Sequence, residues 1–137
     1  MKRIEDFSLR VDNVTIVNVT PHPLTFLSME GNVVIVPSPV EVGEKSCDWV
    51  VNARAEEAWV GEGLVRTNFV GTPEGDRILT MIAEWAEAHS VDNLRIVGSI
   101  IAVNAYPGRV VGMCPAPGFE RVAPAEKRMT TAKFTVA

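Results

Sequence analysis

The stretch TPEGDRILTMIAEWAEAHSVDNLRIV, from Thr72 to Val97, joins a helical pattern directly to a strand pattern. Thr72 can cap a helix and Pro73 suits its first position. Apolar residues then recur at helical spacing, so we predict the main helix over 73–89. The apolar run 94–97 follows as a strand. A helix that leads into an apolar strand favours a parallel crossover. We therefore predict an α/β or α+β fold with one mixed sheet.

The N-terminal half is rich in β-branched residues and predicts strands. In the run 14–19, alternation places Val14 and Ile16 on one face and Val17 and Val19 on the other. Turn residues separate this run from the next ones, which favours a hairpin or a meander. The further strand candidates are 24–27, 33–36, 49–51 and 64–67, and 53–58 is expected to form a short helical turn.

The second half continues with a short helix over 99–106, which Ser99 caps and a Pro-Gly pair ends. The run 109–113 is then predicted to be a strand. From Pro115 onward, prolines, a glycine and charged residues interrupt regular structure. We therefore predict a single globular domain over 1–114 and an extended C-terminal arm over 115–137. This arm packs on the domain or on a neighbouring subunit.

Composition limits the classes of partner. The chain has 137 residues, which suits one domain. Seventeen acidic against 13 basic residues give a net charge of -4, which argues against a general electrostatic grip on nucleic acid. A local basic pocket for a small anion is compatible with this balance. No apolar run is long enough to span a membrane, so we expect no membrane partner.

Cysteine and histidine usage indicates a cytoplasmic protein without a metal. Cys47 and Cys114 are expected to be free thiols, because no signal peptide precedes them. His22 and His89 lie far apart in sequence without a metal-type spacing. No phosphate-binding glycine motif is present either. We therefore predict a cytoplasmic location, no metal and no cofactor.

Two stretches carry a resemblance to a protein family. Asn18-Val19-Thr20-Pro21-His22 resembles the N-L-T-P-H signature near the start of small uncharacterised proteins of bacteria and their phages. RIVGSIIAVNAYPGRVVGMCPAPGFERVAPAEKRM, residues 95–129, resembles one branch of the same group. Val19 replaces the commoner leucine, which is a conservative difference. The resemblance implies a phage or prophage context and assigns no catalytic residue.

The first candidate site lies at Thr20 and His22. Pro21 fixes its own φ, and Pro23 biases His22 toward extended backbone, so a stiff segment presents the imidazole at the end of a strand. Groups presented in this way suit contact with a ligand. The alternative is a structural turn, in which Thr20 caps the turn and His22 bonds a backbone carbonyl.

The second candidate site surrounds the short helix. Ser99 follows a strand and opens the helix, where a hydroxyl and free N–H groups can hold a phosphate or carboxylate. Asn104 and Arg109 can bind phosphate or base edges, and Tyr106 can stack on a ring. The alternatives are an ordinary N-cap and a polar loop. Ile101 replaces the last glycine of a Gly-x-Ser-x-Gly elbow, so a serine hydrolase is not expected.

Three hypotheses for function follow. The preferred one is a non-catalytic, homo-oligomeric protein that binds a small nucleotide-like anion through Thr20, His22, Ser99, Asn104, Tyr106 and Arg109. In a phage setting such a protein would sequester a host nucleotide signal. The second is a hydrolase or lyase acting on a similar ligand, with His22 as general base. The third is a structural or protein-interaction module whose C-terminal arm docks on a partner.

Overall fold

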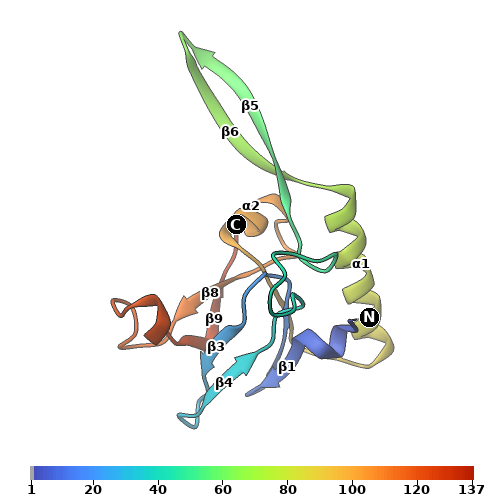
Figure 1. Ribbon diagram of the computed structural model, residues 1–137, viewed down its shortest axis with the longest axis vertical. Coiled ribbons are helices and arrows are strands. Elements are labelled where there is room, and N and C mark those ends of the chain that lie inside the picture. Colours follow the sequence, from blue (N-terminus) through green and yellow to red (C-terminus); the bar gives the residue numbers. More distant parts are fainter. Residues whose placement is uncertain (1) are drawn as a thin grey trace.

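The computed structural model describes residues 2–137 and shows a mixed, β-rich α/β fold, as the sequence predicts (Figure 1). Three groups of strands and two α-helices form the chain. Two short 3-10 helices add to these, η1 at Ile4–Phe7 and η2 at Pro124–Glu126. The other elements are β1 (Ser8–Val11), β2 (Val14–Asn18), β3 (Leu24–Leu27), β4 (Val33–Val36), β5 (Ala53–Gly61), β6 (Leu64–Gly71), α1 (Pro73–Ala88), β7 (Leu94–Val97), α2 (Ile100–Ala105), β8 (Gly112–Pro115) and β9 (Met129–Thr135).

The first sheet has the order β1-β2-β7, with β2 in its centre. β2 pairs antiparallel with β1 and parallel with β7. The parallel crossover predicted from the sequence is therefore confirmed, since α1 precedes β7 and returns the chain to the edge of β2. The two faces of β2 lie in different hydrophobic clusters, with Ile16 in one and Val17 in the other. This separation follows from the alternation of side chains along a strand.

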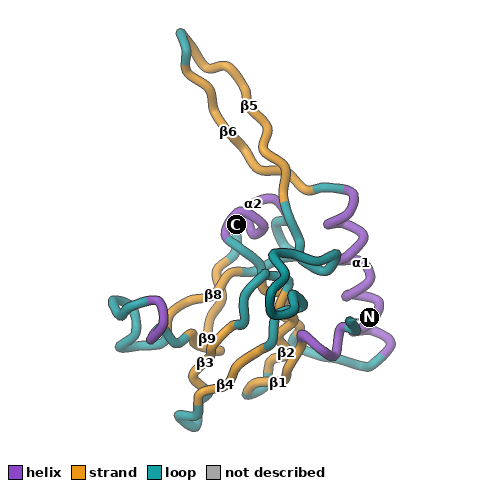
Figure 2. Tube along the Cα trace, in the orientation of Figure 1, coloured by secondary structure: helices purple, strands orange, loops and turns teal. Residues whose placement is uncertain are grey.

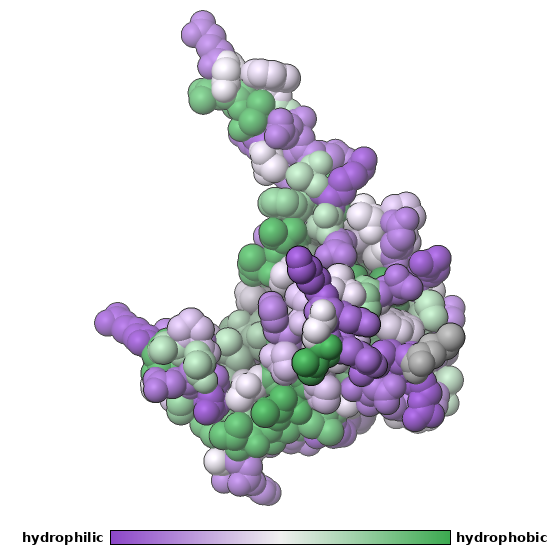
Figure 3. Space-filling view, in the orientation of Figure 1, coloured by the Kyte–Doolittle hydropathy of each residue, from purple (hydrophilic) through white to green (hydrophobic). Residues whose placement is uncertain are grey.

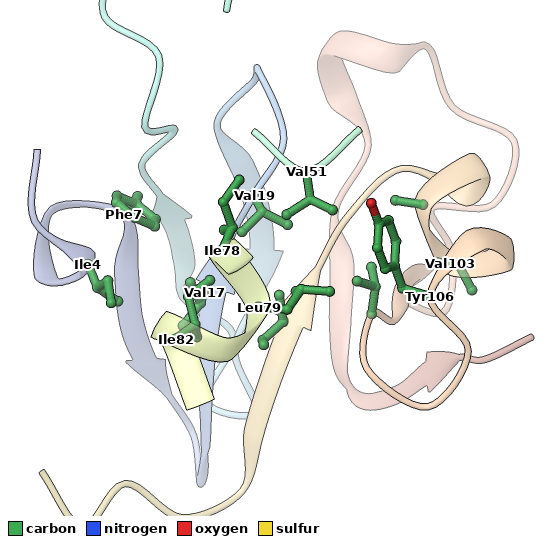
Figure 4. Packing of buried hydrophobic residues seen from close by; sticks show 13 residues of the cluster. Ile4, Phe7, Val17, Val19, Val51, Ile78, Leu79, Ile82, Val103 and Tyr106 are labelled. Carbon is green, nitrogen blue, oxygen red and sulfur yellow. The ribbon is translucent and has the colours of Figure 1, made fainter. Parts of the chain in front are cut away.

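α1 covers one face of this sheet and completes the larger hydrophobic cluster (Figure 4). Thr72 caps the helix by accepting a hydrogen bond from the Gly75 N–H at 3.0 Å, which confirms the predicted start. Its apolar stripe then buries Ile78, Leu79 and Ile82. Each such side chain contributes roughly 1.5–3 kcal/mol on full burial. α1 is therefore held mainly by packing against β2 and β7.

The second sheet has the order β4-β3-β9-β8 and corrects the prediction of one mixed sheet. The Pro21–Pro23 turn ends β2, and the chain then begins β3 in a separate sheet. The C-terminal segment, which the sequence predicts to be an extended arm, contains η2 and supplies the inner strand β9. β9 pairs parallel with β3 and antiparallel with β8. A propensity argument misses this strand because one of its partners, β3, lies about a hundred residues away along the chain.

β5 and β6 form a long antiparallel hairpin that projects from the body of the molecule (Figures 1 and 2). The predicted strand at 64–67 is confirmed within β6. The predicted helical turn at 53–58 is wrong, because this segment pairs with β6 residue by residue. The predicted strand at 49–51 is also wrong, and these residues form turn and irregular structure. Pairing with β6 therefore overrides the helical composition of 53–58.

The strand predicted at 109–113 begins later, as β8 (Gly112–Pro115), because residues 107–109 form a turn. The short helix is present. Ser99 caps α2 by accepting a hydrogen bond from the Ala102 N–H at 3.2 Å. Cys47 and Cys114 are free cysteines. Within residues 2–137, no helix has the length and apolar character that crossing a bilayer requires.

The buried side chain of Asn18 joins the two large sheets where β2 ends. Its Nδ2 donates to the carbonyl oxygens of His22 at 2.8 Å and Pro37 at 3.1 Å, with Val36 at 3.4 Å. Its Oδ1 accepts from the N–H and the hydroxyl of Thr20, at 2.9 and 2.7 Å. Since Asn18 is fully buried, no water replaces these partners. One amide thereby fixes both the turn after β2 and the exit of β4.

We predict that Asn18→Ala lowers the free energy of unfolding by about 2–4 kcal/mol, because several buried polar groups lose their partner. Urea denaturation followed by circular dichroism measures this change. Asn13→Ala is the matched control, since Asn13 is exposed and its side chain makes no hydrogen bond in the described structure. Equal stability of the two variants would contradict the role of Asn18.

Candidate functional site

A groove of about 580 Å³ lies between α1, β7 and β9. This volume falls in the range of roughly 300–1,000 Å³ that is typical of small-molecule sites. Its walls are of mixed character, with apolar contributions from Leu79 of α1, Leu94 of β7 and Phe134 of β9 beside polar and basic residues. The full lining is Leu79, Ala83, Leu94, Arg95, Ile96, Gly108, Arg109, Val111, Thr131, Ala132, Lys133, Phe134 and Val136.

Three cationic side chains and no acidic one line this groove: Arg95, Arg109 and Lys133. They come from three different parts of the chain, namely β7, the loop after α2, and β9. The chain as a whole carries a net charge of -4. The groove is therefore a local concentration of positive charge on an acidic protein, and it favours an anionic ligand.

The Arg95 guanidinium lies over the ring of Phe134, with its Cζ 5.9 Å from the ring centroid. Its Nη1 also donates to the carbonyl of Leu94 at 3.1 Å. Both contacts orient a half-buried cation without neutralising it, and Arg95 forms no ion pair with a carboxylate among residues 2–137. A planar guanidinium held in this way can bind two oxygens of a phosphate.

Arg109 lies at the rim of the groove and contacts α1. Its Nη1 pairs with the Asp76 carboxylate at 2.9 Å, while Nη2 is 3.4 Å from the Thr80 hydroxyl. This ion pair is exposed, so it contributes little to stability. Lys133 is also exposed, and its ammonium makes no hydrogen bond or ion pair with the described residues. Both cations are accessible from solvent.

Thr20 and Ser99 meet at a different place, a depression of about 370 Å³ beside the end of β2. Lys45, Ser46 and Asn52 line it with them. The Thr20 hydroxyl is engaged with Asn18, and the Ser99 hydroxyl caps α2. The structure therefore places two of the sequence-predicted site residues in one depression. The hydroxyl of each, however, is engaged in hydrogen bonds within its own segment.

His22 and Asn104 line neither of these two places. Both side chains are exposed. The backbone carbonyl of His22, rather than its imidazole, is the group that Asn18 and Thr20 hold, at 2.8 and 2.9 Å. The turn expected from the two prolines is present. It places the His22 carbonyl where the side chains of Asn18 and Thr20 donate hydrogen bonds to it.

The expectation that Tyr106 offers a stacking surface is corrected by its position in the core (Figure 4). The residue is 2% exposed. Its hydroxyl donates to the Asn52 carbonyl at 2.7 Å and accepts from the Thr72 N–H at 2.8 Å. A Cβ added at Gly75 would meet this hydroxyl at 1.9 Å, so the ring is closely enclosed. Tyr106 thus anchors the base of the hairpin and the start of α1.

Sequence reasoning missed Arg95, Lys133 and Phe134. Arg95 is the one charged residue in the apolar run 94–97. A charged residue that interrupts an apolar strand is a signal of a binding residue that the sequence alone offers. Lys133 and Phe134 were assigned to an arm, so their place beside β7 could not be read from the chain. Among residues 2–137, no three His, Cys, Asp or Glu side chains gather as a metal site.

No protein-family model, curated protein or solved structure matches the chain in the comparisons. The case for a function therefore depends on the geometry of the groove.

We predict that Tyr106→Phe lowers the free energy of unfolding by about 1–3 kcal/mol, because the Thr72 N–H and the Asn52 carbonyl lose a buried partner. Urea denaturation measures the change. Thr80→Ala is the hydroxyl-deletion control, because its hydroxyl makes only a 3.4 Å surface contact. A loss no greater than that of the control would show that the Tyr106 hydroxyl does not hold these elements.

Proposed function

We propose that this protein binds a small nucleotide-like anion in the groove between α1, β7 and β9, and that it does so without catalysis. The observation that carries this proposal is that Arg95, Arg109 and Lys133 line one open groove, whose other walls are in part apolar. Arg109 is the only one of the predicted site residues in that lining. The site residues are accordingly the three cations together with Phe134.

The two kinds of lining match the two parts of a nucleotide. Guanidinium and ammonium groups bind phosphate oxygens by charge-assisted hydrogen bonds, each worth about 1.5–3 kcal/mol. The apolar part of the lining suits a base, whose burial adds to the binding free energy. A ligand with both parts uses the whole groove, whereas inorganic phosphate uses only the cations.

Sequestration of a nucleotide signal is the role that we propose for this binding. The resemblance of Asn18–His22 to proteins of bacteria and their phages supports such a setting. The position of His22 favours binding over the hydrolase or lyase alternative, because His22 does not line the groove. A general base must reach the proton that it removes.

We predict that adenosine mono- and triphosphate bind with measurable heat in isothermal titration calorimetry, and that adenosine binds more weakly. Lys133→Ala should raise the dissociation constant by tenfold or more, because one charge-assisted contact is lost. Its side chain has no partner in the described structure, so the fold should be retained.

Lys45→Ala is the matched control, because Lys45 is an exposed lysine that lines the depression at Thr20 and Ser99 instead. Loss of binding in Lys45→Ala, with wild-type affinity in Lys133→Ala, would move the site to that depression. Absence of binding by every nucleotide at millimolar concentration would overturn the proposal.

We also predict that affinity for the triphosphate falls as sodium chloride rises from 50 to 500 mM, more steeply than affinity for the monophosphate. Exposed cations act through solvent, where salt screens them over about 10 Å at 0.1 M. Titration at three salt concentrations measures both slopes. Affinities independent of salt would indicate apolar contacts alone.

A further inference from the structure

The hairpin β5–β6 leaves the body of the protein without a partner (Figure 1). Every residue from Arg54 to Phe69 is exposed. Neither outer edge of this two-stranded sheet pairs with another strand in the described structure. An isolated hairpin of this kind is marginally stable in water, and an exposed edge is a template for a further strand.

The two faces of the hairpin differ in chemistry. The register pairs Trp59 with Val65 and Ala55 with Phe69, and these four side chains share one face. Trp59 is 78% exposed, so the apolar side chains of this face, which also carries Glu57 and Thr67, are uncovered. Figure 3 shows further apolar side chains near the tip of the hairpin. The opposite face carries the Arg54–Glu56 ion pair at 2.8 Å.

We propose that β6 pairs antiparallel with β6 of a second copy of this chain, about a two-fold axis at Thr67. The two hairpins then form one four-stranded sheet in the order β5-β6-β6-β5. An isologous contact of this kind needs a strand that is complementary to itself. The sequence of β6 meets that condition over its length.

The symmetric register sets favourable pairs opposite each other. Phe69 faces the partner's Val65, an aromatic and β-branched pair, and Thr67 faces its own copy. On the other face, Arg66 lies opposite the partner's Asn68, so no like charges lie directly opposite each other. The row Trp59, Val65, partner's Phe69, partner's Ala55 then runs across all four strands.

β5 does not offer the same complementarity. A two-fold axis at the middle of β5 would set Glu56 or Glu57 opposite its own copy, which is unfavourable. The register of β5 also shifts between Trp59 and Gly61, where Val60 is the extra residue. Such a bulge disrupts an edge and protects it from pairing. The free edge of β6 is therefore the one suited to a second copy.

Antiparallel pairing places the tip of one hairpin, where Val60 and Leu64 are exposed, beside the base of the other.

Light scattering during size exclusion should give the wild-type protein twice the 14.9 kDa chain mass. Thr67→Lys places two ammonium groups face to face at the axis and should give a monomer. Glu57→Lys is the matched control, since Glu57 pairs with Thr67 but lies on the outer strand, and it should remain dimeric. A monomeric wild type, or a dimeric Thr67→Lys, would overturn the proposal.

Cysteine cross-linking tests the register in a Cys47→Ser, Cys114→Ser background. Thr67→Cys should form a disulfide-linked dimer on oxidation, because the axis brings the two thiols opposite each other. Arg66→Cys and Asn68→Cys should each stay uncrosslinked alone and form a linked dimer when mixed. A dimer that cross-links in none of these pairs uses another surface. Neither light scattering nor cross-linking depends on nucleotide binding. This proposal can therefore fail while the proposed function holds, and the reverse.

Discussion

The Asn18 amide is the interaction on which the arrangement of the two large sheets depends. It lies at the end of the central strand of one sheet and holds the backbone where β4 leaves the other. A buried amide of this kind is costly when unpaired. The low dielectric of the interior strengthens its hydrogen bonds and also raises the free-energy cost of leaving the amide without a partner. The geometry of the β2–β3 turn and of the β4 exit is therefore set together.

The groove is a consequence of that arrangement. Its one wall is α1 and β7, which belong with the first sheet, and its other wall is β9 of the second. Thr131 of β9 donates its hydroxyl to the Asp12 carboxylate in the turn between β1 and β2. Asp12 also accepts from the Met29 N–H at 3.1 Å, so the two sheets are joined at this end as well. Cations from both walls thereby face one cavity.

Tyr106 plays the corresponding role for the hairpin. Its hydroxyl binds the chain just before β5 and just after β6, so the two strands leave the body from one fixed point. The same hydroxyl also holds the start of α1, which forms one wall of the groove, so the hairpin and the groove share this support.

Local patterns in the sequence determined the elements whose stabilising contacts lie nearby: the Thr72-capped helix, the hairpin β3–β4, the cap at Ser99 and the two-faced strand β2. They also indicated Arg109, which lines the groove, as a candidate ligand-binding residue. Only the tertiary structure decided that 53–58 is a strand, that β9 enters the second sheet and that Tyr106 is buried. Arg95 and Lys133 likewise line one groove only through folding, since α2, β8 and η2 lie between β7 and β9 along the chain. The physical reason is that strand pairing and pocket formation depend on contacts distant in sequence, which local propensity does not encode.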